Sequence, residues 1–73
     1  MTSRGYNITI ERLSEKLGGG FVGYAAALMG CVADGDSEAE ALTNLGDAID
    51  CWLAAARANH RPIPQRDLEL LTT

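Results

Sequence analysis

Residues 30–53 read GCVADGDSEAEALTNLGDAIDCWL, and this stretch carries the clearest structural pattern in the chain. Ser37 is suited to cap a helix, because its hydroxyl can accept a hydrogen bond from the Glu40 amide while the Glu40 carboxylate reaches back to the Ser37 amide. Gly35, between two aspartates, can adopt a positive φ in the turn before this helix. The stretch therefore predicts the end of a short strand, a tight polar turn and one long helix.

The predicted helix has a broad apolar stripe along one side. Its members recur at steps of three and four residues, as in a helix that packs on a core: Ala41, Leu42, Leu45, Ala48, Ile49, Trp52, Leu53 and Ala56. Trp52 lies at the centre of the stripe and is expected in the core. Asp47 and Asp50 fall on the opposite side and are expected to face solvent. The helix is predicted to end at Asn59 in a left-handed turn, before two prolines that prevent its continuation.

Two strands are predicted before this stretch. Tyr6–Glu11 alternates between apolar and polar residues, which is typical of a half-buried strand. Residues 21–26 are apolar on both faces, so their second face is expected to be covered by the C-terminal segment or by another subunit. The glycines at 18–20 between them predict a hairpin connection, because a phosphate-binding loop would need a following Lys-Ser/Thr and a helix. Residues 1–5 are expected to form a loose terminus.

These elements together predict the fold class. Residues 31–33 are expected to form a short third strand, and residues 67–71 a fourth strand or a fragment of helix. The prediction is an α+β, two-layer fold in which an antiparallel sheet of three to four strands carries one main helix on one face. The predicted order is β-β-β-α-β, within a single domain that spans residues 1–73.

Size and charge restrict the classes of function. A chain of 73 residues buries a small core, so we expect a homo-oligomer, most simply a dimer. The net charge of −4 disfavours non-specific binding to nucleic acid, which depends on cations that neutralise phosphates. A basic protein is the better match as a partner.

The cysteines and the apolar runs indicate a cytoplasmic protein. Cys31 and Cys51 are too few for a disulfide scaffold, and they are expected to be buried or half-buried thiols in a reducing cytoplasm, with a disulfide or a metal site as the alternative. No apolar run is long enough to span a membrane, and the N-terminus has no signal-peptide pattern. No cofactor and no metal ion are expected.

The order of the motifs resembles the HicB family of antitoxins. The resemblance covers residues 6–64 and rests on a Tyr-containing first strand, Gly-Gly-Phe-Val at the second, Gly-Cys-Val-Ala-Asp-Gly-Asp-Ser with Glu40-Ala41, and Pro62-Ile63-Pro64. It implies a partial ribonuclease-H-like fold and a cytoplasmic protein that binds and blocks HicA, a small RNA-cleaving toxin. Many HicB proteins carry a further C-terminal DNA-binding domain. This chain ends at Thr73 without room for one, so no direct DNA binding by the chain is expected.

Three hypotheses for the function follow. The first is an antitoxin that covers a basic toxin, and the second is an orphan interaction or oligomerisation module without a toxin. The third, a metal-dependent nuclease, would need several converging carboxylates. It is disfavoured because Ile8, Thr9 and Ile10 occupy the middle of the first strand, where that chemistry places an aspartate. We therefore expect no enzymatic activity and no catalytic residue; His60, the only histidine, is expected to be a surface group at the helix end.

The predicted partner-binding residues are carboxylates that the pattern places on the surface. They lie at the capping turn and on the outer side of the helix: Asp34, Asp36, Glu38, Asp47 and Asp50. A toxin that binds RNA should present a basic surface, which such carboxylates can cover. The sheet or the apolar second strand is then expected to serve self-association.

Overall fold

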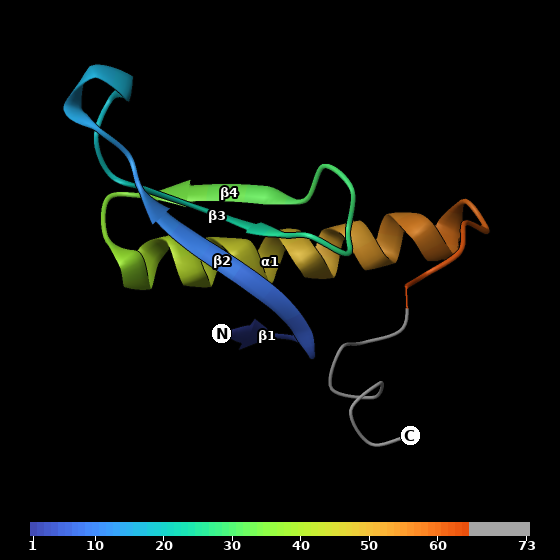
Figure 1. Cartoon of the computed structure of the whole chain (residues 1–73). Coiled ribbons are helices and arrows are strands. Elements are labelled where there is room, and N and C mark those ends of the chain that lie inside the picture. The colour runs from blue at the N-terminus through green and yellow to red at the C-terminus, as the bar shows by residue number, and fades with distance from the viewer. Residues whose placement is uncertain (65–73) are drawn as a thin grey trace.

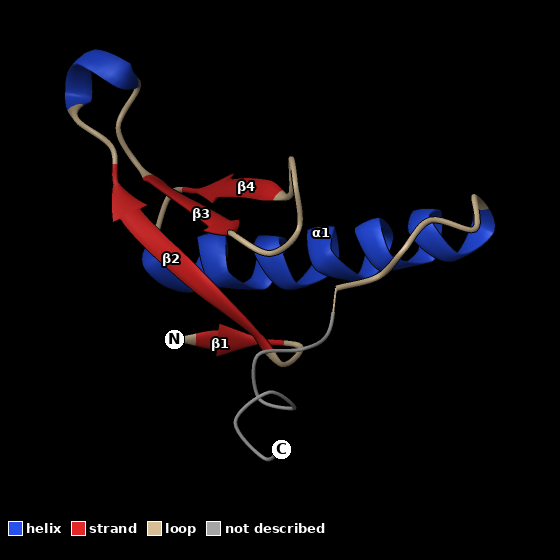
Figure 2. Ribbon diagram, turned by 45° about the vertical axis from the view of Figure 1, so that its right-hand side comes forward, coloured by secondary structure: helices blue, strands red, loops and turns tan. Residues whose placement is uncertain are grey.

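A four-stranded antiparallel sheet is covered on one face by a single long helix (Figures 1 and 2). The computed structural model describes residues 1–64, and the strand order in the sheet is β1-β2-β3-β4. The elements along the chain are β1 (Thr2–Ser3), β2 (Tyr6–Arg12), the short 3-10 helix η1 (Glu15–Leu17), β3 (Phe21–Ala25), β4 (Val32–Gly35) and α1 (Glu38–Ala58). The predicted α+β class and the helix on one face of the sheet are confirmed.

The predicted order of the elements is wrong. The described chain runs β-β-β-β-α instead of β-β-β-α-β, because the fourth strand is formed by the N-terminus, which was expected to be loose. β1 pairs with the start of β2 through a two-residue turn in which Arg4 and Gly5 have φ of 53° and 86°. Positive φ at both positions is the geometry of the tightest β-hairpins. The strand or helix fragment predicted at 67–71 lies outside the described residues.

β2, β3 and β4 form the main part of the sheet. Ile10 is opposite Gly23 and Gly23 is opposite Ala33, so these three residues form one row that faces α1. A Cβ atom at Gly23 would lie 2.6 Å from Ile10 Cδ1 and 3.1 Å from Leu45 Cδ2. Glycine at this position therefore allows α1 to lie close on the sheet. The predicted hairpin between β2 and β3 is confirmed, with η1 at its tip.

The core lies between the sheet and α1. Its buried apolar side chains come from β2, from β3 and the loop after it, and from one stripe of the helix: Tyr6, Ile8, Ala25, Leu28, Cys31, Ala41, Leu45, Ile49, Leu53 and Ala56. Trp52 was expected among them but is half-buried and packs against the edge of this core. Its indole N–H donates a hydrogen bond of 2.9 Å to the Met29 carbonyl, so Trp52 holds the loop between β3 and β4.

The start of α1 confirms Ser37 as the helix cap and corrects the role of Gly35. The Ser37 hydroxyl accepts a hydrogen bond of 3.1 Å from the Glu40 amide. The φ of Gly35 is not positive. A Cβ atom there would instead lie 2.5 Å from the Ala41 nitrogen and 2.8 Å from the Glu40 carbonyl carbon. Gly35 is required because the end of β4 touches the first turn of the helix.

The end of α1 is a Schellman motif. The His60 amide donates to the Arg57 carbonyl at 3.2 Å, and the Arg61 amide donates to the Ala56 carbonyl at 2.8 Å. The residue in the left-handed region is His60, with φ of 54°, and not Asn59, whose φ is −98°. The helix therefore ends where the sequence predicts, through a turn one residue later than expected. Within residues 1–64, α1 lacks the length of apolar sequence that a membrane crossing requires.

Candidate protein-binding site

Three of the predicted carboxylates lie where β4 leads into α1. Asp34 is on β4, Asp36 is in the turn, and Glu38 is the first residue of the helix. The Ser37 cap and the tight contact at Gly35 fix the backbone that carries them. All three residues are exposed, and their carboxylates form no ion pair with the part of the chain that the structure describes. We call Asp34, Asp36 and Glu38 the turn carboxylates.

The strand register brings a further carboxylate into line with this group. Val22 of β3 is opposite Asp34 on one side and opposite Glu11 of β2 on the other. These three side chains point away from α1, because the alternate residues, such as Ala33, pack against the core. Sequence alternation predicts that Glu11 faces outward. It does not predict that Glu11 and Asp34 flank one apolar side chain, which needs the register of three strands.

The remaining two predicted carboxylates lie in the middle of α1. Asp50 accepts hydrogen bonds from Arg4 in the β1–β2 turn, with Nε–Oδ1, Nε–Oδ2 and Nη2–Oδ2 distances of 3.0, 3.2 and 3.1 Å. The hydrogen bond to Asp50, the charge of Asp50 and the more distant charge of Asp47 raise the pKa of Arg4 above its ordinary value. Asp50 is 54% exposed, as expected, but its carboxylate is paired with a cation and is not free.

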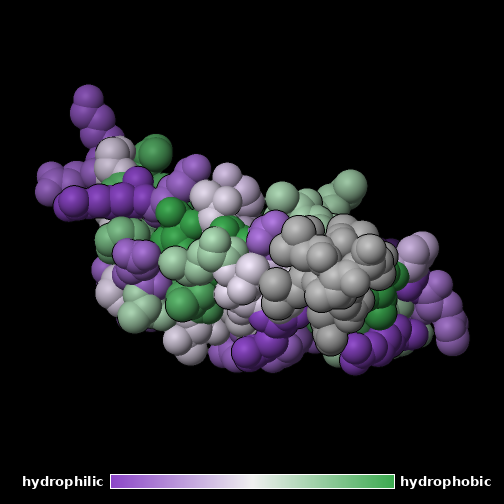
Figure 3. Space-filling view, turned by 60° about the horizontal axis from the view of Figure 1, so that its bottom comes forward, coloured by the Kyte–Doolittle hydropathy of each residue, from purple (hydrophilic) through white to green (hydrophobic). Residues whose placement is uncertain are grey.

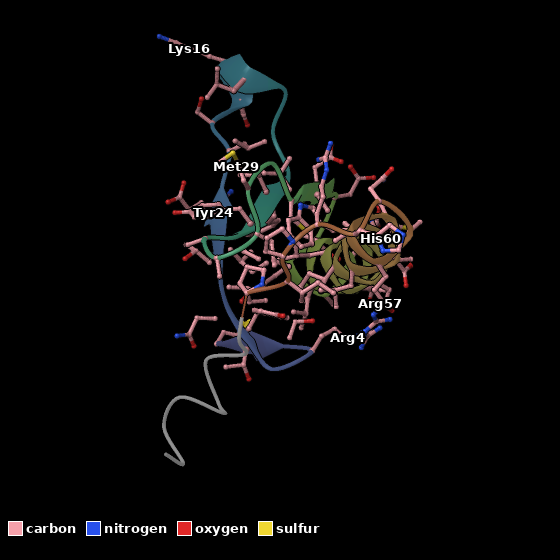
Figure 4. All side chains as sticks on the ribbon, turned by 90° about the vertical axis from the view of Figure 1, so that its right-hand side faces the viewer. Arg4, Lys16, Tyr24, Met29, Arg57 and His60 are labelled. Carbon is pink, nitrogen blue, oxygen red and sulfur yellow. The ribbon has the colours of Figure 1, made fainter. Side chains whose placement is uncertain are left out.

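The five carboxylates do not form one surface. Asp34 lies on the outer face of the sheet, because the alternate residue Ala33 packs on the core. Asp47 and Asp50 belong to α1, which covers the other face (Figure 1). Figure 4 shows Arg4, the partner of Asp50, beside the helix, while Tyr24 and Met29 lie on the far side of the molecule from Arg4. A partner that covers the outer face of the sheet would therefore leave the Asp47 side of α1 uncovered.

Apolar side chains lie beside the turn carboxylates on the outer face. Tyr24 of β3 is opposite Val32 of β4, next to the row that contains Val22 and Asp34. Val22 and Tyr24 are half-buried, Val32 is 59% exposed, and the Tyr24 hydroxyl lies 3.5 Å from Glu11 Oε1. The second face of β3, expected to be covered, is thus left partly open by residues 1–64. Figure 3, a view from another side, likewise shows apolar atoms gathered between polar ones on the surface.

The groups with catalytic potential are dispersed. His60 is exposed beyond the end of α1, Cys51 is exposed on the helix, and Cys31 is buried, where desolvation raises the pKa of its thiol. The expectation of two buried or half-buried thiols is thus correct for Cys31 and wrong for Cys51. No three His, Cys, Asp or Glu side chains among residues 1–64 come together in an arrangement that could hold a metal ion.

Two curated proteins are similar to this chain over most of its length. The UPF0150 protein ssr1765 of Synechocystis sp. is 36% identical over 63 residues, which are 86% of this chain and 78% of that protein. The UPF0150 protein ssl0259 of the same organism is 36% identical over 65 residues, which are 89% of this chain and 85% of that protein. No family model matches the chain, and no solved structure is significantly similar to it.

Proposed function

This chain belongs to the UPF0150 family, and we propose that it is an antitoxin that binds and neutralises a small, basic, RNA-cleaving toxin of the HicA type. The resemblance of residues 6–64 to HicB proteins supports the proposal. The family relationship is compatible with it, and the names of the relatives state no activity.

The observation that carries the proposal is the set of turn carboxylates. They are exposed, they are not compensated by a cation among residues 1–64, and they are held on a backbone that is fixed by a helix cap. Carboxylates fixed in this way can pair with the cations of an RNA-binding surface without first being ordered, and such pairs speed association and favour the correct partner. Apolar side chains beside them can supply the buried centre of an interface.

The turn carboxylates are favoured over the helix carboxylates as the principal contact. Asp50 already neutralises Arg4, so Arg4, Asp47 and Asp50 together carry one net negative charge. The turn carboxylates carry three negative charges within five residues. Glu11, on the other side of Val22 from Asp34, adds a fourth. A basic partner therefore gains more electrostatic energy at the turn than at the middle of the helix.

The proposal predicts that a small basic protein is encoded beside this gene, and that protein, once identified, is used for the test. Co-expression with this chain should relieve its toxicity, and the purified pair should associate. Replacement of Asp34 and Asp36 by lysine should slow that association. A matched control replaces Glu15 and Asp47 by lysine. Each replacement of a carboxylate by lysine raises the net charge by two, so both double variants change it from −4 to 0. The control should associate at a rate close to that of the wild type.

Each outcome distinguishes between the hypotheses. A slower control with an unchanged Asp34/Asp36 variant would move the toxin from the turn carboxylates to the surface around Glu15 or Asp47, and the two single replacements would then distinguish η1 from the helix face. Absence of a toxic neighbour and of any association would contradict the antitoxin proposal and favour an orphan interaction module. Cleavage of RNA by the purified chain in the presence of Mg²⁺ would favour the nuclease hypothesis.

A further inference from the structure

We propose that two copies of this chain form a symmetric dimer in which residues 31–33 of each copy, at the open edge of the sheet, pair antiparallel about a two-fold axis at Val32. β4 is the last strand of the sheet, and it pairs with β3 on one side. Among residues 1–64, no strand covers its other edge. Open edges of this kind present backbone donors and acceptors to another strand. This proposal does not depend on the antitoxin function.

The hydrogen bonds of β4 show where a second strand can pair. The Ala25 amide donates to the Cys31 carbonyl at 3.2 Å, so the backbone carbonyl of Cys31 points toward β3. Because backbone groups alternate in direction along an antiparallel strand, the N–H and C=O of Val32 and of Asp34 point to the open edge. The Asn44 side chain, through Nδ2, donates to the Asp34 carbonyl at 2.8 Å and occupies that position. Val32 is the residue that keeps both groups available.

A pairing centred on Val32 is compatible with the charges on the strand. Each Val32 would exchange two hydrogen bonds with the Val32 of the other copy. The ladder would be short, because β4 begins at Val32 and the chain turns at Gly30, whose φ is 78°, so each Asp34 would face that turn of the other copy. The two Asp34 residues would be four residues apart along the strands, or about 13 Å. That separation exceeds the Debye length of about 8 Å at physiological salt. A pairing centred on Asp34 would place the two carboxylates directly opposite each other.

The same pairing joins the apolar side chains on the outer face. Tyr24 lies opposite Val32 within one copy, so the two-fold axis would produce a continuous row of Tyr24, Val32, Val32 and Tyr24 across both copies. Val32 is 59% exposed in the single chain, and the pairing would cover it. Cross-strand apolar pairs of this kind stabilise a sheet.

One flank of α1 runs beside the same edge. The hydrogen bond from Asn44 to Asp34 and the bond from Trp52 to Met29 tie this flank to β4 and to the loop before it. α1 also packs against β4 more extensively than against the other strands. Pairing of the two sheet edges at Val32 therefore brings the two helices together along this flank, and the interface includes both layers.

The residues on this flank are small. Ala48, Cys51 and Ala55 follow Asn44 at steps of three and four residues, so they share its side of the helix. Ala48 is half-buried, and Cys51 and Ala55 are exposed. Because Ala48 lies one turn after Asn44, it is level with Val32 and close to the proposed axis. Small side chains here allow two helices to approach to the 8–10 Å that is usual for packed pairs.

The dimensions of the molecule fit an interface of ordinary size. A standard interface covers about 800 Å² on each partner, about one sixth of the 5053 Å² surface of this chain. α1 has 21 residues and so extends for about 31 Å along the edge. The molecule is only 16 Å thick in its shortest dimension. A contact that includes both the sheet and the helix at this edge therefore extends across most of that thickness.

Disulfide cross-linking tests the register directly. In a background that carries Cys51→Ser, Val32→Cys should form an intermolecular disulfide rapidly under mild oxidation. Hydrogen-bonded antiparallel pairs have a Cα–Cα distance of about 5.5 Å, within the range for disulfides. The matched variant Asp34→Cys lies two residues along the same exposed strand, where the copies are about 13 Å apart, and should cross-link far more slowly. Equal rates for the two variants, or no Val32→Cys cross-link, would overturn the proposal.

Sedimentation velocity tests the assembly itself. The wild type should be a dimer, and Val32→Asp, which places two carboxylates at the axis, should be a monomer with an unchanged circular dichroism spectrum. Leu17→Asp makes the same kind of apolar-to-acidic change at an exposed residue of η1, away from the edge, and should remain a dimer. A wild-type monomer at concentrations up to about 1 mM, the weak end of specific association, would overturn the proposal.

Discussion

Two glycines near α1 perform different tasks at the scale of single residues. Gly35 lies where β4 touches the first turn of the helix, and a Cβ atom there would lie 2.5 Å from the backbone nitrogen of Ala41. Gly46 lies inside the helix, where a Cβ atom would be 3.4 Å from Arg4 Nη2 and 3.5 Å from Ser3 Oγ. These are ordinary contact distances to the ends of side chains. Only the first glycine is required by the packing of the backbone.

We therefore expect opposite effects from alanine at these two positions. Gly35→Ala should reduce the free energy of unfolding by about 1–3 kcal/mol, as overpacking usually does. Gly46→Ala should leave it unchanged or raise it by up to about 1 kcal/mol, because alanine is the better helix former. Urea denaturation at one fixed protein concentration measures both. Equal destabilisation of the two variants would show that the contact at Gly35 is relieved by small backbone shifts.

The two cysteines should differ in reactivity. Cys31 is 4% exposed, and burial raises the pKa of its thiol, so less of the reactive thiolate forms at a given pH. Cys51 is exposed on α1. In dilute native protein, a thiol reagent at pH 8 should modify Cys51 rapidly and Cys31 slowly. Cys51→Ser should remove the fast phase, and denaturant should abolish the difference. Two fast phases in the native protein would contradict the burial of Cys31.

At the scale of elements, the N-terminal hairpin depends on a contact distant in sequence. β1 has two residues, and Arg4 beside it pairs with Asp50, 46 positions further along the chain. Both side chains are about half exposed, so solvent and salt weaken the pair. The pair nevertheless joins the β1–β2 turn to the helix.

Removal of the Asp50 charge should loosen β1 while the rest of the sheet is preserved. Asp50→Asn should speed hydrogen exchange at the Ile8 amide, which donates to the Met1 carbonyl at 2.9 Å. The amides shared by β2 and β3 should keep their protection, since their partners are unchanged. Asp47→Asn removes a neighbouring charge but leaves the Arg4–Asp50 ion pair in place, so it serves as the control. Unchanged exchange at Ile8 in Asp50→Asn would show that the turn holds β1 without the ion pair.

The capped start of α1 is the best defined junction between two elements. Ser37→Ala removes the acceptor for the Glu40 amide and should lower the free energy of unfolding by about 1 kcal/mol. Ser37→Asp keeps an acceptor and should retain most of the stability. Thermal denaturation followed by circular dichroism measures the difference, and equal stability of Ser37→Ala and the wild type would contradict the cap.

At the scale of the whole molecule, the two proposed associations should respond to salt in opposite ways. Each copy carries a net charge of −4, so self-association brings like charges together and screening should favour it. Association with a basic toxin brings opposite charges together, so salt should slow it. Dimer dissociation constants and toxin association rates measured in 50 and in 300 mM NaCl would test this contrast. If salt strengthened both associations or weakened both, one of the two proposed interfaces would be wrong.

Local sequence patterns were sufficient for the elements whose causes are local. The cap at Ser37, the apolar stripe that packs Leu45 and Ile49 into the core, and the inward face of Tyr6 and Ile8 all appear as predicted. Each depends on residues within a few positions of one another, through the period of a helix or a strand. These features also establish the α+β class and the helix on one face of the sheet.

The remaining features depend on contacts between residues far apart in the chain. β1 forms where an Arg-Gly turn, which carries no strong hairpin signal, is followed by a long-range pair to Asp50. The role of Gly35 follows from a helix that lies against the strand, and the line of Glu11, Val22 and Asp34 follows from the register of three strands. Sequence alternation assigns a side chain to a face but does not specify its neighbours across a sheet. For that reason the sequence identified the five carboxylates, whereas only the packed chain separated them into a turn group and a helix group.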